Sequence, residues 1–363
     1  MYPPTARRAA LPLLALAASF AVALPAPAQA GVPTGAESVA SITDGLARRL
    51  AGTLATPAAR SRVTAAVAAA PVDLANLSLG TQFATARTAA NHAVQTAKGL
   101  PTTADSLLRV RLAHPDMLPA LAKGVTPLVA AAPTDDTDGA LSAYEPSGAE
   151  VKLDTTVVPQ RPVLLVEVDV AKALPLGARV VEQTLAARGV GTAQTRSGLN
   201  AGYWATKINA VRLSDDEEPW IKGDAEIYSI VSGFGLDGHP KVDIVQQPYL
   251  NNDGTTYYPN QLLVHFSAYK YNLADVVMME DDGDTNYLQL AQAIAAILLT
   301  ITDQGAYIPL VNAILNAIPT SWWTDDPDYT ESWYTLATWS SGRLNGASGN
   351  GWMDVSPYWV APL

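Results

Sequence analysis

Apolar residues recur at helical spacing through the Ala-rich stretch 34–121, which holds few aromatic side chains. Side chains three and four positions apart share one face of a helix, so this spacing is typical of helices that pack on a core. The pattern predicts helices at residues 37–54, 58–69, 81–97 and 103–113.

From residue 125 the pattern changes to short apolar runs separated by turn residues. Such runs predict strands, and a Pro/Gly turn between two of them predicts a hairpin. A helix is expected next, ending before Gly189, because glycine is common just after a helix C-terminus. The predicted strands are 125–131, 140–144, 150–153 and 162–170, with the turn at 145–148 and the helix at 177–188.

The remainder of the chain is dominated by strand patterns with one helical insert at 286–318. The number of strands is that of a small β-sandwich. Within the insert, residues 287–301 and 308–318 are helical in pattern, and the first is apolar on nearly every side, which predicts a buried helix. The predicted strands are 203–213, 225–232, 242–245, 261–266, 275–279, 333–338 and 352–356.

These elements predict an α+β protein, a helical and α+β region followed by a mainly antiparallel β-sandwich with a buried helical insert. Composition divides the chain at the same place. All 8 Trp lie after residue 200, and from residue 201 onward 20 Asp and Glu stand against 6 Lys and Arg, a local balance of −14. We therefore expect an Ala-rich part at 31–200 and an acidic, aromatic-rich part at 201–363, joined through the Gly/Thr/Ser-rich stretch 189–202.

The first thirty residues have the pattern of a secretory signal peptide. Arg7 and Arg8 precede the apolar run 11–24, and Ala28-Gln29-Ala30 forms a small-residue cleavage site. The run is shorter than the roughly 20 apolar residues of a spanning helix. We expect cleavage after Ala30, no membrane anchor afterwards, and a secreted or periplasmic location.

Composition and motifs narrow the function classes. The Cys count is 0, which excludes disulfides and thiolate metal sites, and the net charge of −11 argues against nucleic acid as a partner. HExxH, GxSxG and P-loop motifs are absent, and the four histidines (His92, His114, His239 and His265) are scattered along the chain. The sequence leaves open whether the chain is an enzyme.

The densest candidate site is the acidic turn at 280–286, EDDGDTN. Calcium takes six to eight oxygen ligands, mostly carboxylates and carbonyls, and other acidic turns would add to the set if strand topology brought them together. The candidate calcium ligands are Asp224, Asp253, Asp281, Asp282 and Asp284. An EF-hand loop is excluded, because its sixth position holds Tyr287 and its twelfth Ala293. The alternative is a solvated turn in which Asp284 or Thr285 caps the next helix.

Four segments of the second part, KGDAEIY at 222–228, NNDGTTYYPNQ at 251–261, MEDDGDTNY at 279–287 and SWWTDDPDYTESWYTL at 321–336, carry a resemblance. Over residues 219–355 the chain resembles an uncharacterised family of secreted bacterial proteins, which implies no activity. The strand that opens on Glu226-Ile227-Tyr228 and the EDDGD turn at 280–284 are similar to C2-type β-sandwiches, and this resemblance implies calcium bound between opposed acidic loops.

Three functions follow from these patterns. The first is a secreted binding or structural protein with a calcium-stabilised, C2-like β-sandwich and a glycan or protein ligand. The second is a secreted metal-dependent hydrolase whose first part serves as a propeptide. The third is a carbohydrate-binding module that uses Trp322, Trp323, Tyr257 and Tyr258, because aromatic rings stack on sugar rings.

Overall fold

The fold class is α+β, as the sequence predicts. The computed structural model describes residues 37–102, 105–134, 140–191, 202–214, Ile221, 226–281, 283–318 and 329–362. These residues contain seven α-helices and fourteen strands, and the strands form three mostly antiparallel sheets. The helices are α1 (Val39–Thr53), α2 (Pro57–Val67), α3 (Thr81–Ala97), α4 (Leu118–Ala122), α5 (Val170–Ala187), α6 (Tyr287–Leu298) and α7 (Val311–Ala317).

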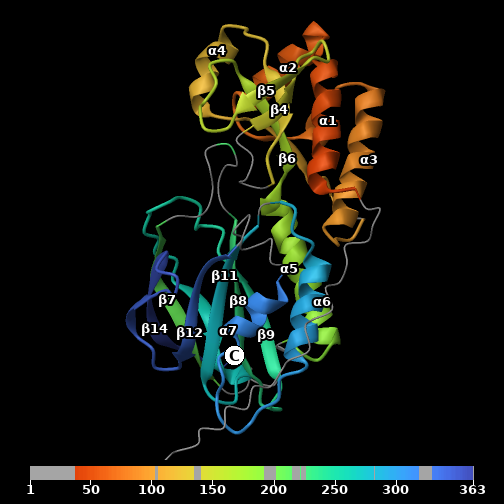
Figure 1. Cartoon of the computed structure of the whole chain (residues 1–363). Coiled ribbons are helices and arrows are strands. Elements are labelled where there is room, and N and C mark those ends of the chain that lie inside the picture. Colours follow the sequence, from red (N-terminus) through yellow and green to blue (C-terminus); the bar gives the residue numbers. More distant parts are fainter. Residues whose placement is uncertain are drawn as a thin grey trace, which may run out of the picture. The chain divides into compact units, whose positions relative to one another are not determined.

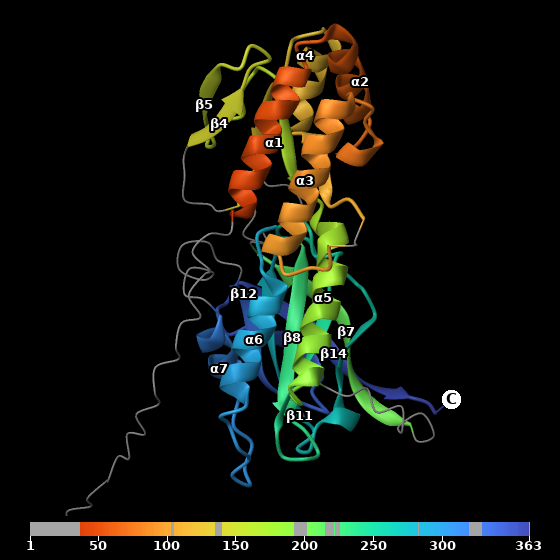
Figure 2. The ribbon, with the colours of Figure 1, turned by 90° about the vertical axis from the view of Figure 1, so that its right-hand side faces the viewer.

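The first sheet has six strands in the order β1-β2-β6-β3-β4-β5. Only β3 and β6 pair in parallel; the other neighbours are antiparallel. Its strands are β1 (Val72–Asp73), β2 (Leu108–Leu112), β3 (Leu128–Ala131), β4 (Ala140–Tyr144), β5 (Glu150–Asp154) and β6 (Val163–Val168). Helices α1 and α3 lie side by side (Figure 2), and α1 packs against β3 and β6 through the buried stripe Ile42, Leu46 and Leu50.

The second and third sheets have four strands each, in the orders β12-β11-β8-β9 and β10-β7-β14-β13. Their strands are β7 (Tyr203–Leu213), β8 (Ile227–Phe234), β9 (Pro240–Gln246), β10 (Gln261–His265), β11 (Leu273–Glu280), β12 (Tyr329–Ala337), β13 (Gly342–Asn345) and β14 (Gly351–Val360). Side chains from both sheets form one hydrophobic cluster, with Val231 and Val276 from the second sheet and Ile208 and Met353 from the third.

Three helices cover the second sheet. Helices α5, α6 and α7 lie beside β8, β9 and β11 (Figures 1 and 2), and their apolar residues share one core with Ile230, Val277 and Met279 of that sheet. The described residues from 37 to 362 form one compact unit, and α5, which the sequence places before the boundary at residue 200, packs against β9. The division at residue 200 stays a prediction, since residues 192–201 lie outside the described part.

Two predicted helices change in the structure. The helix expected at 103–113 is wrong: residues 108–112 form strand β2, in which Leu108 and Val110 are buried and alternate with Arg109 and Arg111, whose charges Glu167 of β6 neutralises. Helix α5 begins at Val170 and continues through Pro175, because residues on both sides of the proline are held in the core.

The helical insert is buried on one face only. Leu290, Ile294 and Leu298 of α6 face the core, whereas Leu288 on the same helix and Leu299 after it are exposed. The expectation of a helix buried on all sides is therefore wrong, because the core that α6 shares with α5 and α7 covers a single face. Strand β13 was not predicted, since its sequence, GRLN, has no apolar alternation. In the described part of the chain, no helix combines the length and apolar character needed to cross a membrane.

Candidate functional site

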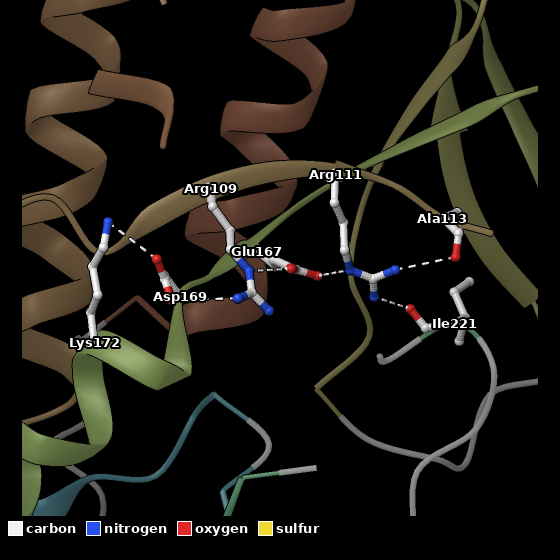
Figure 3. Close-up of polar contacts among 7 residues, drawn as sticks. All are labelled: Arg109, Arg111, Ala113, Glu167, Asp169, Lys172 and Ile221. Carbon is white, nitrogen blue, oxygen red and sulfur yellow. Dashed lines mark hydrogen bonds and ion pairs between the residues drawn. The ribbon is translucent and has the colours of Figure 1, made fainter. Parts of the chain in front are cut away.

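A row of alternating positive and negative side chains lies across strands β2 and β6 of the first sheet, next to the start of α5 (Figure 3). Glu167 of β6 lies opposite Arg109 of β2 and accepts from two guanidinium groups: Arg109 Nε donates to its Oε1 at 2.5 Å and Arg111 Nε to its Oε2 at 2.8 Å. Arg111 also donates to the backbone oxygens of Ala113 at 3.2 Å and Ile221 at 2.5 Å. Each oxygen of the Glu167 carboxylate is therefore occupied by an arginine.

The network continues to α5 through Asp169. Arg109 Nη1 lies 3.4 Å from Asp169 Oδ1, and Lys172 Nζ lies 3.1 Å from Asp169 Oδ2 and 2.6 Å from Asp73 Oδ2. Burial is the largest single effect and lowers the pKa of Arg109, but the charge and hydrogen bond of Glu167, together with the charges of Asp169 and Glu226, outweigh it and the net shift is upward. Among these residues three cations, Arg109, Arg111 and Lys172, face three carboxylates, Glu167, Asp169 and Asp73, and the ion pairs of Asp169 tie the start of α5 to β2.

The acidic turn after β11 contains a buried ion pair. Asp281 Oδ1 lies 3.4 Å from Nζ of Lys98, the residue that follows α3, and both side chains are 0 % exposed. The Tyr287 hydroxyl donates to Oδ2, and the backbone N–H of Gly283 donates to Oδ1 at 2.9 Å. Burial, followed by the charge of Asp281, raises the pKa of Tyr287 well above its usual value of 10.0 and keeps the phenol a donor. Both oxygens of Asp281 are thus engaged inside the protein.

The other predicted calcium ligands lie in different surroundings. Asp253 and Asp284 are exposed, and Asp224 and Asp282 lie outside the described residues. The sheet register places the loops at one end, because Glu280 pairs with Ile227 and Tyr228 pairs with Gln246. Across residues 37–362, apart from the stretches that the structure does not describe, no group of three or more His, Asp or Glu is arranged to hold a metal ion.

The acidic turn at 280–286 ends at the N-cap of α6, and the N-cap residue differs from the two that the sequence predicted. Neither Asp284 nor Thr285 caps α6. Asn286 does, since its side-chain oxygen accepts from the Gln289 N–H at 3.0 Å and its amide donates to the Ala97 oxygen at 2.6 Å. The second bond favours Asn at this position, because an amide side chain accepts through its oxygen at the helix start and donates through its nitrogen to α3.

A group of exposed indoles lies at the opposite end of the third sheet. Trp204 is the second residue of β7, Trp359 lies near the end of β14, and Trp339 follows β12; we call these three residues the indole cluster. The Trp204 ring is 4.6 Å from the Trp339 ring and 5.3 Å from the Trp359 ring, both inclined by about 60° (59° and 61°). Trp339 is 64 % exposed and Trp359 is 47 % exposed.

The backbone and neighbouring strands hold the indole cluster in place. Trp204 and Trp359 are direct cross-strand partners. Gly202 leaves room for the Trp359 ring, because a Cβ there would lie 2.3 Å from it. Close by on the same strands, the Lys207 ammonium lies 5.6 Å from the ring of Tyr358, which is also exposed. Strand pairing therefore positions the rings of Trp204 and Trp359, and Trp339, in the turn after β12, packs on the Trp204 ring.

The aromatic residues that the sequence singled out for stacking on sugars differ from this cluster. The Tyr257 hydroxyl donates to Asn251 at 2.9 Å and its ring packs 6.0 Å from Tyr249, so it fastens a turn. Tyr258 is exposed, and Trp322 and Trp323 lie outside the described residues. The indole cluster was missed because its members come from three distant segments: β7 and β14 pair in the third sheet, and Trp339 follows β12 of the second sheet.

The chain belongs to the family described as "Protein of unknown function (DUF3103)", whose model matches residues 41–363. The match covers both parts of the chain and extends well beyond the resemblance that the sequence showed at 219–355. A comparison with curated proteins finds no match, and neither does a comparison with solved structures.

Proposed function

We propose that this chain, a member of a family without an assigned activity, is an exported binding protein that holds neutral carbohydrate on the indole cluster. The observation that carries the proposal is the exposure of Trp339 and Trp359 on rings that Trp204 and the β7–β14 pair keep in fixed positions. Large aromatic side chains left in water at one place mark a binding surface more often than isolated exposed residues do.

The chemistry of the cluster fits a sugar chain. Indole rings offer flat apolar faces and a single N–H donor, and they lose little conformational freedom when a ligand covers them. The C–H faces of pyranose rings pack on such surfaces while the hydroxyls stay in water. The three members are uncharged, and the chain carries a net charge of −11, which disfavours polyanions and favours a neutral ligand.

The rest of the architecture supports a scaffold for binding. The cluster of buried residues shared by the second and third sheets supports a β-sandwich with the indole cluster at one end. The pattern of residues 7–30 supports export. The ion pairs of Glu167 and Asp169 with Arg109 and Arg111 join β2, β6 and the start of α5, which supports a structural role for this network.

Retention on insoluble polysaccharides tests the proposal. Cellulose, chitin and an uncharged resin are each mixed with the wild-type protein, with Trp339→Ala, and with Trp352→Ala as a matched tryptophan control. Trp352 lies at the other end of β14, where Arg343 packs 4.1 Å over its ring. We expect retention on at least one polysaccharide that Trp339→Ala loses and Trp352→Ala keeps. Equal retention of all three proteins contradicts the proposal, and so does the absence of wild-type binding to every glycan of a wider array. Binding of the indole cluster to a protein in place of a glycan also contradicts it.

Calcium at the acidic end of the sheets is a second proposal, supported by the strand registers that bring the loops carrying Asp253 and Asp284 to one end. Asp281 is a poor ligand in this scheme, because the Lys98 ammonium already neutralises it. A site held at 100 times its dissociation constant would add about 2.7 kcal/mol to the free energy of unfolding. Thermal melting with calcium chloride and with a chelator tests it: a higher midpoint with calcium supports the site, and identical midpoints contradict it.

A further inference from the structure

Lys98 and Asp281 are an unusual pair because neither side chain meets water. Both are 0 % exposed, although lysine and aspartate are rarely buried completely. Among the carboxylates in the described residues, that of Asp281 is the one within ion-pair distance of the Lys98 nitrogen, at 3.4 Å. Taking both charges out of water is costly, so the pair requires an explanation beyond surface electrostatics.

The surroundings hold the amine and the carboxyl group in one orientation. The Tyr287 ring lies 4.9 Å from Lys98 Nζ, and its hydroxyl donates to Asp281 Oδ2. The backbone also ties the two segments together, because the Tyr287 N–H donates to the Lys98 oxygen at 3.1 Å. The Gly283 N–H fixes the other carboxyl oxygen, and side chains of Val168 and Val170 close the space beside Gly283. The result is a buried site in which the Lys98 amine faces the Asp281 carboxyl group and the charge of Glu226 also acts on Tyr287.

We propose that Lys98 and Asp281 are joined by an isopeptide bond between Nζ and Cγ. A proton passes from the ammonium to Oδ1, which leaves a neutral amine facing a carboxylic acid. The nitrogen lone pair attacks Cγ while the Tyr287 O–H and its hydrogen bond stabilise the charge that develops on Oδ2. The Cγ–Oδ1 bond then breaks, and Oδ1 leaves as water with its own hydrogen and one from the nitrogen. One amide bond and one water molecule form, and nothing is oxidised or reduced.

Proximity makes this condensation feasible without a co-reactant. In water an amine and a carboxylate do not condense to an appreciable extent, but groups held in a reactive geometry have effective concentrations of about 10⁵–10⁸ M. Departure of the released water from an apolar pocket works in the same direction. The bond would join segments 183 positions apart in a chain whose Cys count is 0, so it would do the work of a disulfide.

The mass of the full-length protein and of its tryptic peptides tests the proposal. We expect the purified chain to be lighter than its sequence by one water, and one branched peptide to contain both Lys98 and Asp281. Cyclisation at an Asp-Gly step, such as Asp253-Gly254, also releases water but joins no two peptides. An ordinary linear peptide ending in free Lys98, with no branched partner, overturns the proposal whatever the variants do.

Three variants sharpen the result. Lys98→Met removes the amine and should restore the full sequence mass, whereas Asp281→Asn should still form the bond and lose ammonia in place of water. Lys172→Met is the matched control, since Lys172 pairs with Asp73 at 2.6 Å but is 43 % exposed; it should keep the water loss. A denaturing gel should show faster migration of the wild type than of Lys98→Met. Water loss retained in Lys98→Met contradicts the assignment to this pair.

Discussion

Substitution of Gly177 in α5 tests how tightly the core around Tyr287 is packed. A Cβ at this position would lie 2.3 Å from two atoms of the Tyr287 ring and 2.4 Å from a third. That ring is almost fully buried, and its hydroxyl is bound to Asp281, so it has no room to retreat. Glycine at this site is therefore expected to be required by contact with another element and not by backbone conformation.

The change in the free energy of unfolding expected for Gly177→Ala is the sum of two opposing effects. Glycine to alanine inside a helix normally stabilises by about 0.5–1 kcal/mol, because alanine loses less backbone entropy. Forcing a methyl group into a filled core costs about 1–3 kcal/mol or more. For Gly177→Ala the contact distance is short enough for the second effect to win, and we expect a net loss of about 1–2 kcal/mol. Gly45→Ala in α1 is the control: nothing lies within 4 Å of its Cβ position, so it should stabilise.

Urea denaturation followed by circular dichroism measures both changes. We expect the unfolding midpoint of Gly177→Ala to fall and that of Gly45→Ala to rise slightly. In a Tyr287→Ala background the penalty of Gly177→Ala should disappear, because the atoms it meets are gone. A Gly177→Ala protein as stable as the wild type, or a penalty that persists without the Tyr287 ring, would refute the packing described for α5 and α6.

Three further changes test separate contacts. The Lys270 ammonium, with further hydrogen bonds from Tyr271 and Gly305, lowers the pKa of Asp303 from 3.8 to about 2. The stabilisation from the ionised carboxylate is therefore present above about pH 4 and is lost as the pH falls toward 2. Asp303→Asn should be less stable than the wild type at pH 7, and the urea midpoints of the two proteins should converge between pH 4 and pH 2. Buried Glu331 accepts hydrogen bonds from three backbone N–H groups, those of Ser332 and Ser348 at 2.8 Å and that of Gly351 at 2.9 Å. Glu331→Ala leaves these donors without their acceptor and should lower the free energy of unfolding, measured in urea, by about 2–5 kcal/mol. A decrease of less than about 1 kcal/mol would contradict these hydrogen bonds. Glu167→Gln removes the charge shared by two arginines and should lower the free energy of unfolding by about 2–4 kcal/mol, whereas a neutral effect would show that the network adds nothing to stability.

Local patterns predicted most of the elements, because helix and strand periods are properties of short segments. The helix at 81–97 and the strand at 203–213 have the bounds that the apolar spacing predicted. Strand β2 was missed because its arginines looked like the polar side of a helix, while their partner Glu167 lies more than fifty positions away. The prediction of the α6 N-cap was wrong for a similar reason. Asn286 also donates a hydrogen bond to the Ala97 oxygen, a residue far away in the sequence that no local pattern includes.

The candidate sites depended even more on tertiary structure. The acidic turn was visible in the sequence, but the lysine that neutralises Asp281 lies 183 positions earlier. Five carboxylates within one chain could be named as ligands, yet only strand register shows which loops share an end. The three indoles of the cluster could be counted in the sequence, whereas their mutual distances follow from the pairing of β7 with β14 and from the packing of Trp339 on Trp204.

The most direct test of the central claim is a calorimetric titration of the full-length protein with the oligosaccharide of the polysaccharide that retains it. We predict that Trp339→Ala weakens binding by about tenfold or more, the size expected when an aromatic residue central to a binding surface is removed. Trp352→Ala should leave the affinity unchanged, and both variants should melt within a few degrees of the wild type. An unchanged affinity of folded Trp339→Ala would contradict binding at the indole cluster.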